Sequence, residues 1–338
     1  MSSILTFGMA FQQSVSINVT GNKIFPVEFW YRPIAVDLYQ AEKTKGWRTM
    51  YVIGIDSGGT HIVAIAFNGE EQIAQAETTG GGNIALDAAG TVHRIVGTVE
   101  KIFQQLPAAA CAGILVGIAG VATAGGQDQV VSALHELFAG PVVVISDADL
   151  AMLNGLHGKN GVVAIAGTGS IVLAQTPQGR LRVGGWGWRF GDEGSAYDIA
   201  RRAFQTILSA RDHGRVSPLE VPLCAALQVP DYRAAVSRTY QMDRGTFAGL
   251  ARAVAQAATP ANLDARGAVI DAANALSDQI TLALVRTRLP AHATIALTGS
   301  VPANNDLYFQ VVTDRLGSHP LRRLQGSNAP GVQYYRFR

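Results

Sequence analysis

The hydrophobic pattern of the chain becomes regular from Tyr51 onward. Residues 51–55 form a short β-branched run, and residues 61–67 form a second one. Gly58 and Gly59 interrupt the pattern between the two runs. Because glycines between two β-type runs mark a turn, this stretch predicts two strands joined as a hairpin.

Strand and helix patterns alternate along the rest of the first half. The helical segments have apolar residues three or four positions apart, whereas the strand segments are continuous apolar runs. The expected elements are a helix over 85–106, a strand over 113–119, a helix over 128–138 and a strand over 142–145. This alternation predicts an α/β domain with a mostly parallel sheet.

The second half opens as the first does. An apolar run over 162–165 is interrupted by glycines and resumes over 171–175. Beyond it we expect strands over 180–183 and 294–297, with alanine-rich helical patterns over 196–210 and 247–289. The repeat predicts a duplicated fold with an N-terminal lobe over 50–160 and a C-terminal lobe over 161–338. A ligand cleft is expected between the two lobes.

The first 49 residues do not follow this pattern. Residues 1–49 are aromatic-rich near 25–31, and they have neither the basic start nor the continuous apolar stretch of a secretion signal. We predict that they form a poorly ordered or non-native extension without a function of its own.

Composition narrows the class of protein. A chain of 338 residues exceeds the roughly 250 to 300 residues at which single cores stop growing, which agrees with two lobes. Hydrophobic residues make up 48% and charged residues 15%, so a large core can form. Lys and Arg exceed Asp and Glu only by 27 to 25 and are scattered, which argues against nucleic acid or an anionic membrane as partner. The most apolar stretches, 113–123 and 161–175, are interrupted before the roughly 20 residues that a membrane helix needs.

The sequence contains only two cysteines, Cys111 and Cys224. Two distant cysteines exclude a disulfide scaffold, a four-cysteine zinc site and a C-x-x-C redox motif. A reduced, cytoplasmic compartment is therefore expected.

The loop Asp56-Ser57-Gly58-Gly59-Thr60 has the composition of a phosphate-binding turn. Its glycines let backbone N–H groups approach an anion without an intervening Cβ. Thr60 adds a hydroxyl, and Asp56 is a candidate Mg²⁺ residue that acts through water, because magnesium keeps much of its hydration shell. The alternative is an ordinary hairpin turn with an Asp cap.

Two further glycine breaks extend this hypothesis. Gly167-Thr168-Gly169-Ser170 opens the second half in the corresponding place, so the two hairpins together predict a nucleotide site. The alternative is a turn in which glycine is selected only for a positive φ. Gly299 and Ser300 follow the last predicted strand, where an open α/β sheet presents ligand-binding residues, and adenosine is expected to pack there.

Asp147 follows the predicted strand over 142–145. This position places a carboxylate at the carboxyl end of a strand, where it can accept the proton of an attacking hydroxyl during phosphoryl transfer. Asp147 is therefore the candidate catalytic base. The alternative role, an N-cap for a helix over 150–156, fits Asp149 better.

The run from Gly184 to Tyr197 combines glycines, large aromatic residues and two acids directly before a predicted helix. Aromatic rings can pack on the apolar faces of a sugar, and Asp192 can accept hydrogen bonds from sugar hydroxyls. For Trp188 core packing is the preferred role, and for Glu193 compensation of the helix dipole is preferred.

This run, with 167–170 upstream, closely resembles the N-acetylglucosamine kinases of the BadF/BadG/BcrA/BcrD ATPase superfamily. The resemblance extends from Tyr51 to about Leu316 and includes 227–231 and 247–249. It implies an actin-like, ribonuclease H-like sugar-kinase fold that uses ATP and Mg²⁺ on an amino sugar, in a cytoplasmic homodimer.

Carried over by position, the resemblance assigns roles to residues of this chain. It implies Asp147 as the base. For the sugar it implies Asn83, Gly185, Trp186 and Asp192. It implies Thr60 and Thr168 at the phosphates, and Ala248, Ser300 and Asn304 near the adenosine. From the loops themselves, Asp56 remains the metal candidate, and Gly58, Gly59, Gly167, Gly169 and Gly299 are the nucleotide-binding glycines. Taken alone, Asn83 is a polar loop residue that suits a turn.

The end of the chain departs from this resemblance. Residues 317–338 lack the small-residue helix expected to finish such kinases, so we expect an altered end that exposes the adenosine side of the lobe.

Several functional alternatives differ in what they require. P-loop, Rossmann, serine-hydrolase and zincin motifs are absent from the sequence. An ATPase activator of a 2-hydroxyacyl-CoA dehydratase would need exposed, paired cysteines, and a sugar sensor would not need Asp147. The expected product is N-acetylglucosamine 6-phosphate, with glucosamine and N-acetylmuramic acid as alternative substrates that the sequence does not separate.

Overall fold

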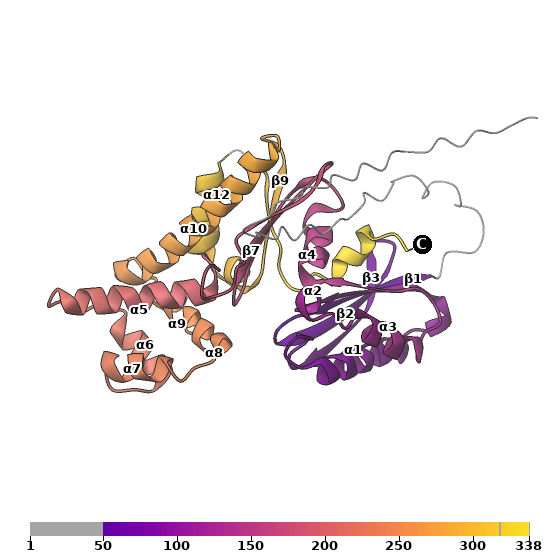
Figure 1. Cartoon of the computed structure of the whole chain (residues 1–338), viewed down its shortest axis with the longest axis horizontal. Coiled ribbons are helices and arrows are strands. Elements are labelled where there is room, and N and C mark those ends of the chain that lie inside the picture. The colour runs from indigo at the N-terminus through magenta and orange to yellow at the C-terminus, as the bar shows by residue number, and fades with distance from the viewer. Residues whose placement is uncertain (1–49, 318, 338) are drawn as a thin grey trace, which may run out of the picture. The chain divides into compact units, whose positions relative to one another are not determined.

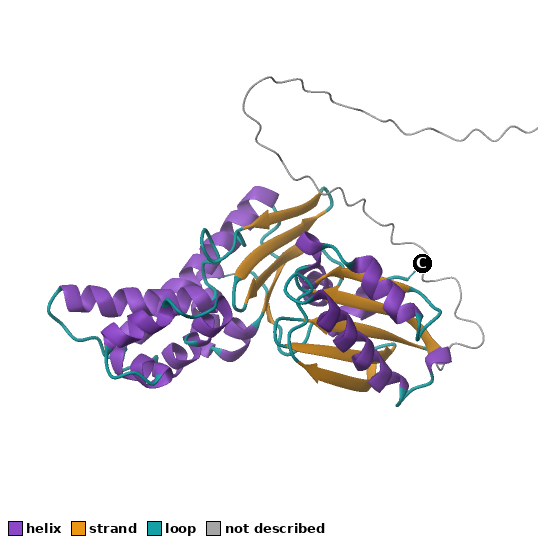
Figure 2. Ribbon diagram, turned by 60° about the horizontal axis from the view of Figure 1, so that its bottom comes forward, coloured by secondary structure: helices purple, strands orange, loops and turns teal. Residues whose placement is uncertain are grey.

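The computed structural model describes residues 50–317 and 319–337. The predicted extension over 1–49 lies outside the described residues. Within the described part the strands gather into two five-stranded sheets, each accompanied by helices (Figure 2). Taken in chain order, the strands of both sheets follow the same arrangement, third-second-first-fourth-fifth.

The first sheet has the order β3-β2-β1-β4-β5 and the second has the order β8-β7-β6-β9-β10. The strands of the first sheet are β1 Tyr51–Ser57, β2 His61–Asn68, β3 Glu71–Thr79, β4 Cys111–Ile118 and β5 Val142–Ser146. Those of the second sheet are β6 Gly161–Ala166, β7 Ser170–Thr176, β8 Gly179–Val183, β9 Thr294–Thr298 and β10 Leu321–Arg323. The predicted duplication is therefore confirmed at the level of sheet topology.

The expectation of mostly parallel sheets was wrong, because both sheets are mixed. In each, the first three strands pair antiparallel and the last two join in parallel. Short turns, including the two glycine loops, can connect only antiparallel strands, whereas parallel strands need a longer crossover. The pattern also failed to predict β3, which is an edge strand with polar, exposed residues on one face.

Helices α1 Ala88–Phe103 and α3 Gln127–His135 cover the first sheet, and α2 Val121–Ala124 is a short turn before α3 (Figure 1). Asp87 caps α1 by accepting a hydrogen bond from the Gly90 N–H. Ile95, Val99 and Ile102 are fully buried against the sheet. Their spacing of three and four residues is the helical period predicted from the sequence.

The second sheet is accompanied by many more helices. They are α5 Ala196–Asp212, α6 Glu220–Leu227, α7 Tyr232–Thr239, α8 Arg244–Gly249, α9 Ala251–Ala257, α10 Leu263–Thr287, α11 Ser300–Asn304 and α12 Asp306–Leu316. The single helical pattern expected over 247–289 is thus divided among three helices. Pro260 lies in the break before α10, and Asn262 caps α10 by accepting from the Ala265 N–H.

Helix α10 is long and apolar enough to cross a membrane by length and composition, but half of its most apolar window is buried inside the protein. Val269, Leu276 and Ile280 are fully buried in the core that contains β6 and β7. Packing within the protein therefore accounts for its apolar character.

Two helical segments connect the halves. Helix α4 Asp147–Leu156 follows the first sheet but packs on β6 and β9, where Met152 and Leu156 join Val163 in one apolar cluster. The 3₁₀ helix η2 Ala329–Tyr334 follows the second sheet but packs on β1, β2 and β4. The two segments also pack against each other, as Figure 1 shows for α4 and the yellow end of the chain.

The end of the chain packs into this core. Ala329 and Val332 are buried together with Leu115 and Leu150, with Phe337 packed against the same cluster. In place of a small-residue helix, the described residues after α12 form β10 and η2. Pro330 at the start of η2 and the large side chains that follow it favour this short element over a small-residue helix.

Candidate active site

The first glycine loop connects β1 to β2 and is held by the segment around Gly82. The Gly82 N–H donates to the Gly58 carbonyl at 2.7 Å, and the Gly80 N–H donates to the Thr60 carbonyl at 2.9 Å. Gly59 and Thr60 are exposed, and a Cβ on Gly59 would meet no atom within 4 Å. The tip of the loop is therefore fixed at its base and open to an incoming anion.

The second glycine loop connects β6 to β7. Gly167 and Gly169 close the turn through a 2.8 Å backbone hydrogen bond, and Thr168 between them is exposed. Neither glycine has a positive φ, so the alternative that glycine is selected only for backbone conformation was wrong. A Cβ on Gly169 would lie 2.1 Å from Nη2 of Arg244 and 2.6 Å from Oδ2 of Asp192. Close approach of this ion pair is the reason for glycine there.

The third glycine break adjoins the second loop. Gly299 has φ +99°, and a Cβ there would lie 2.4 Å from the Ala166 carbonyl oxygen, immediately before Gly167. Ser300 begins α11, and Asn304 donates to the Ser300 carbonyl at 2.9 Å. Residues expected at the phosphates and at adenosine therefore meet where β6 and β9 end, which is the carboxyl edge of those parallel strands.

Asp56 and Asp147 lie at the corresponding edge of the first sheet. Ser57, Ile118 and Ser146 are register neighbours across β1, β4 and β5, so the two aspartates sit beside the ends of these strands. Burial raises the pKa of Asp147, and the negative charge of Asp56 raises it further. The Asp56 carboxylate is thus close enough to Asp147 to disfavour the charged form of Asp147.

Each of these carboxylates has one oxygen held by the protein. Oδ1 of Asp147 accepts from the Ala148 N–H at 2.9 Å. Oδ2 of Asp56 accepts from the Asn328 N–H at 2.7 Å and from the Ser327 hydroxyl at 3.3 Å. Burial raises the pKa of Asp56, and these two hydrogen bonds oppose the rise.

The helix cap beside Asp147 differs from the expected one. Ser146 is the N-cap of α4 and accepts from the Asp149 N–H at 3.0 Å, so the assignment of Asp149 as the cap was wrong. Asp149 instead accepts from the Ser146 hydroxyl and pairs with Arg180 of β8. Ser146 and Asp149 are thus joined by two hydrogen bonds, one through the Asp149 backbone and one through its carboxylate. Capping therefore falls to other residues, and Asp147 is left for another role.

Asn83 lies at the same edge of the first sheet. It forms an isolated bridge with Ala119, directly after β4, and its Oδ1 accepts from the Ala85 N–H at 3.0 Å. The predicted turn role is therefore present. Among the described residues nothing accepts a hydrogen bond from its side-chain NH₂ group, which can donate to a ligand.

The glycine and aromatic run after β8 is largely exposed. Gly184 and Gly185 both have φ +68°, and the side chains of Trp186 and Phe190 are 69% and 83% exposed. The Arg182 guanidinium lies over the Trp186 ring at 4.6 Å. The expectation that Trp188 belongs to the core was wrong, since its side chain is 40% exposed and contacts Tyr197 and the guanidinium of Arg189.

Asp192 is at the centre of this region. It is 3% exposed, has φ +63°, and its Oδ2 accepts from Arg244 at 2.7 Å. Burial raises its pKa, whereas Arg244 and the backbone N–H groups of Ser170 and Gly187 lower it. Asp192 thus joins the second glycine loop, the aromatic run and the start of α8, which carries Ala248.

The neighbouring Glu193 does not act on the helix dipole as expected. Its Oε2 accepts from Gln279 of α10 at 2.8 Å, and α5 begins only at Ala196. The acid in the first turn of α5 is Asp198, which also accepts from the Gly194 N–H and from Arg202. Glu193 therefore ties the aromatic run to α10.

A family model matches residues 53–326 of the chain, and it describes the BadF/BadG/BcrA/BcrD ATPase family. Apart from the first two residues of β1, this span contains both sheets and all three glycine loops. The chain belongs to this family.

Several proteins similar to this chain are named as sugar kinases. The N-acetylmuramic acid/N-acetylglucosamine kinase of Clostridium acetobutylicum is 28% identical over 67% of this chain and 76% of its own length. The N-acetyl-D-glucosamine kinase of Dictyostelium discoideum is 29% identical over 68% of this chain and 77% of its own length. A solved candidate N-acetylglucosamine kinase from Chromobacterium violaceum is 27% identical with a TM-score of 0.67, covering 85% of this chain and 98% of its own.

More distant structures share the actin-like fold. A glucokinase of the ROK family from Streptomyces griseus, solved with glucose and AMPPNP, has a TM-score of 0.54 at 14% identity and covers 84% of this chain and 97% of its own. The predicted α/β fold with two related sheets is confirmed by these neighbours and by the sheet topology.

The two cysteines of this ATPase family member are unpaired. Cys111 is buried in β4, Cys224 is half-buried in α6, and both are free thiols. Burial raises the pKa of Cys111 to about 11. A cluster-binding activator, which would need exposed cysteines that converge, gains no support from this arrangement.

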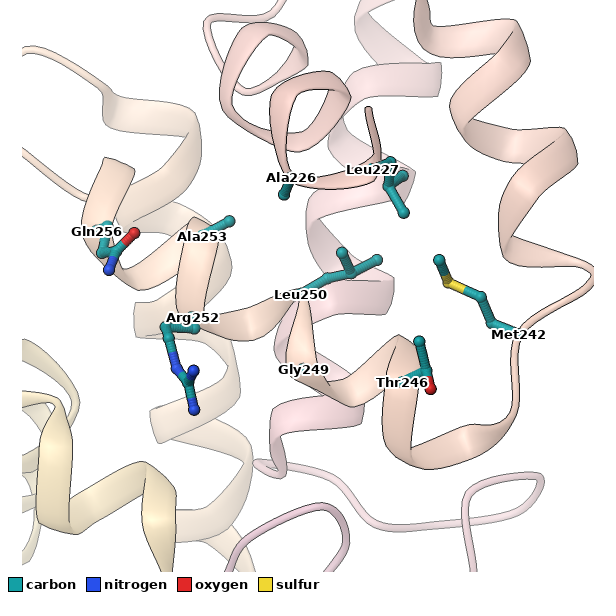
Figure 3. Close-up of a pocket in the computed structure, with 9 residues that line it drawn as sticks. All are labelled: Ala226, Leu227, Met242, Thr246, Gly249, Leu250, Arg252, Ala253 and Gln256. Atoms are coloured by element: carbon teal, nitrogen blue, oxygen red, sulfur yellow. The ribbon is translucent and has the colours of Figure 1, made fainter. Parts of the chain in front are cut away.

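An open cavity of about 370 Å³ lies apart from the predicted site residues. Leu227, Met242 and Leu250 face the same space among α6, α8 and α9 (Figure 3). Ala248, expected near adenosine, is buried in α8 and does not line this cavity. The cavity is therefore a feature of the helical region, separate from the two glycine loops.

Sequence patterns missed several residues that organise the site. Ser327 and Asn328 hold Asp56, Arg244 holds Asp192, and Tyr308 of α12 donates from its hydroxyl to the Gly194 carbonyl at 2.7 Å. Gly326-Ser327-Asn328 has the composition of a turn and Arg244 that of a solvated charge. No local signal distinguishes these residues from ordinary surface positions.

Proposed function

We propose that this chain is an ATP-dependent amino-sugar kinase that converts N-acetylglucosamine to N-acetylglucosamine 6-phosphate. The observation that carries the proposal is the pairing of Asp56 with Asp147 at the strand ends beside the first glycine loop. Two equivalent glycine loops, one in each half, support a site for the phosphates of a nucleotide.

The exposure of each side chain supports its proposed role in binding phosphate or sugar. Thr60 and Thr168 are exposed at the loop tips, where their hydroxyls and the neighbouring N–H groups can bind phosphate oxygens. The exposed ring of Trp186 and the free NH₂ group of Asn83 suit a sugar. Asp192 would act on the sugar mainly by fixing the run that carries Gly185 and Trp186, because its own carboxylate is buried.

In the proposed reaction the sugar O6 attacks the γ-phosphorus in line with the bridging oxygen of ADP. The O6–phosphorus bond forms, the bond from phosphorus to the bridging oxygen breaks, and ADP leaves. The O6 proton passes to Asp147, whose raised pKa makes it a stronger base than an exposed aspartate. No side chain in the described part of the structure bonds to Asp147, so its carboxylate can meet the hydroxyl.

The residues present fit a bound Mg²⁺ ion. Among the described residues no group of three or more His, Cys, Asp or Glu side chains converges as metal ligands. Mg²⁺ commonly needs only one or two carboxylates when water and substrate phosphates complete its shell. Asp56, whose Oδ1 accepts no hydrogen bond within the described part, would hold the hydrated ion. When bound, Mg²⁺ would neutralise charge on the phosphates.

The test is ADP release by the purified chain with Mg-ATP. The panel contains N-acetylglucosamine, glucosamine, N-acetylmuramic acid, glucose and no sugar. We expect strong stimulation by N-acetylglucosamine. Stimulation by N-acetylmuramic acid as well would match the dual name of the Clostridium relative and widen the substrate class. ADP release that no sugar increases would contradict the kinase proposal.

The role of Asp147 has its own test. Asp147→Asn should lower kcat by about 100-fold or more with little change in ATP affinity, because general base catalysis contributes roughly 10² to 10⁴. Asp128→Asn is the matched control, since Asp128 is an exposed acid in the first turn of α3. Near-normal kcat in Asp147→Asn would remove Asp147 from its role.

A further inference from the structure

The loop from Gly326 to Ala329 reaches the candidate metal residue from the far end of the sequence. It follows β10 and ends at the first residue of η2, yet it contacts β1 of the first sheet. Asn328 donates its N–H to Oδ2 of Asp56 at 2.7 Å, and the Ser327 hydroxyl lies 3.3 Å from the same oxygen. We call residues 326–329 the C-terminal clasp.

The clasp is itself held in place by α4, by β9 and by a hydrogen bond within it. Oδ1 of Asn328 lies 3.3 Å from Nδ2 of Asn154 in α4 and 3.4 Å from Oγ1 of Thr298 in β9. The Ser327 hydroxyl accepts from the Ala329 N–H at 3.0 Å. The Asn328 side chain thus links α4 and β9 while its backbone holds Asp56 of β1.

The fit of the clasp on β1 leaves no spare room. A Cβ on Gly54 would lie 2.0 Å from the Ala329 carbonyl oxygen, and Ala329 is fully buried. Gly331 approaches α4 as closely, since a Cβ there would lie 2.7 Å from the Leu150 carbonyl oxygen. Backbone packed against backbone cannot shift as a flexible side chain can, so the Asn328 N–H has a fixed position relative to β1.

The two hydrogen bonds make the two oxygens of the Asp56 carboxylate unequal. Both donors meet Oδ2, and Oδ1 accepts no hydrogen bond from the described residues. A hydrogen bond from a backbone N–H to a charged acceptor is stronger and more directional than one between neutral groups. The clasp therefore favours one orientation of the carboxylate and leaves Oδ1 for a ligand.

We propose that Asn328 and Ser327 are positioning residues for the divalent cation that accompanies ATP, acting through Oδ2 of Asp56. The inference rests on the proposed role of Asp56 in binding Mg-ATP, but it requires neither a sugar nor turnover. It assigns the C-terminal clasp to the nucleotide site of the first half, although the clasp follows the second sheet in sequence.

The test compares two substitutions at position 328. Asn328→Pro removes the backbone N–H that donates to Asp56. The φ of Asn328, −87°, is near the range that proline adopts. Asn328→Ala keeps this N–H and removes only the links to Asn154 and Thr298. ATP binding is measured by titration calorimetry in Mg²⁺ and again in EDTA, with the thermal midpoint of each variant recorded.

We expect Asn328→Pro to weaken ATP binding in Mg²⁺ by about tenfold, the size expected for one hydrogen bond to a charged group, and to change binding in EDTA much less. Asn328→Ala should weaken binding in Mg²⁺ less than Asn328→Pro does. Ser327→Ala, which removes the longer hydrogen bond, should weaken binding in Mg²⁺ by about threefold at native-like thermal stability.

Equal losses in Mg²⁺ and in EDTA would show that the clasp supports only the fold, and this outcome would overturn the inference. Unchanged Mg²⁺-dependent binding in a folded Asn328→Pro variant would overturn it as well. If Asn328→Pro does not fold, the same comparison of ATP binding in Mg²⁺ and in EDTA is made with Ser327→Ala. Failure of every sugar to stimulate ADP release would contradict the proposed function and leave these binding results standing.

Discussion

The two halves share one sheet topology but finish it differently. After the fifth strand of the first sheet, the ten-residue helix α4 begins at Asp147 with a serine cap. After the fifth strand of the second sheet, the chain forms only the six-residue 3₁₀ helix η2, preceded by Asn328. Each element packs on the sheet of the other half. The shared sheet topology therefore provides two similar glycine loops, whereas the different elements after the fifth strands, α4 and η2, provide different functional groups.

Equivalent strand positions show how this difference is accommodated. Gly54 and Val163 both lie three residues before the last residue of the first strand of their sheets. Val163 packs beneath α4 with Met152 and Leu156, whereas Gly54 receives the backbone of Ala329 directly. Where a helix packs on a strand through its side chains, the strand needs a side chain to pack against them. Where the backbone of a turn approaches the strand directly, the strand needs glycine, because any Cβ would overlap that backbone. The sequence difference between the strands thus follows from what each one supports.

The largest effect is expected from filling the space at Gly54. Gly54→Ala should lower the free energy of unfolding by about 2–3 kcal/mol, because the added methyl group would overlap the Ala329 backbone. The same displacement should pull Asn328 away from Asp56 and weaken Mg-ATP binding. Urea denaturation followed by calorimetry measures both effects.

Gly97→Ala is the matched control for this substitution. Gly97 lies within α1, and a Cβ there would meet no atom within 4 Å. Alanine has the higher helix propensity, so this variant should gain about 0.5–1 kcal/mol. Equal behaviour of the two variants would show that the close approach at Gly54 is not what limits substitution there.

The glycine hairpins and Asp147 could be predicted because their signals are local. An apolar run, a glycine break and a second run follow one another within residues 51–67 and again within 162–175, and short turns fix the pairing of the strands. The cap of α4 was misassigned from the same local information. Ser146 and Asp149 both suit a cap, and only the start of the helix decides between them.

The clasp could not be predicted because it depends on contacts between distant residues. Asp56 and Asn328 are 272 positions apart. Every residue except proline has a backbone N–H, so the residue type does not show which N–H will bind Asp56. The contact of Glu193 with Gln279 likewise depends on how α10 packs. The lobe boundaries, the homodimer, the cytoplasmic compartment and the individual ligand contacts stay predictions.

A smaller effect should distinguish the two glycine loops. Thr60→Val and Thr168→Val each remove one exposed hydroxyl while keeping a β-branched side chain of similar size. If both loops bind phosphate, each variant should lower kcat/KM for ATP by about tenfold, which corresponds to about 1.4 kcal/mol. Steady-state kinetics at saturating sugar measures the ratio.

Thr123→Val controls for the loss of a hydroxyl, because Thr123 is exposed in α2 and its hydroxyl donates, within the described part of the chain, to the Gly120 carbonyl alone. It should leave kcat/KM for ATP unchanged. A loss of kcat/KM in Thr60→Val but not in Thr168→Val would show that the two loops are not equivalent. The phosphates would then be bound by the loop of the first half alone.

The smallest expected difference concerns the two thiols, one in each half. Burial raises the pKa of Cys111 to about 11 from 9.0 in the unfolded chain, so its neutral form is favoured by folding. The resulting contribution to stability is complete below pH 9 and is lost as pH rises through about 11, because the unfolded chain then binds fewer protons than the folded one. At pH 8, Ellman's reagent should label half-buried Cys224 faster than Cys111, and Cys224→Ala should leave a thiol that reacts fully only in denaturant. Rapid labelling of Cys111 in the folded Cys224→Ala variant would contradict the tight packing of β4 against its neighbours.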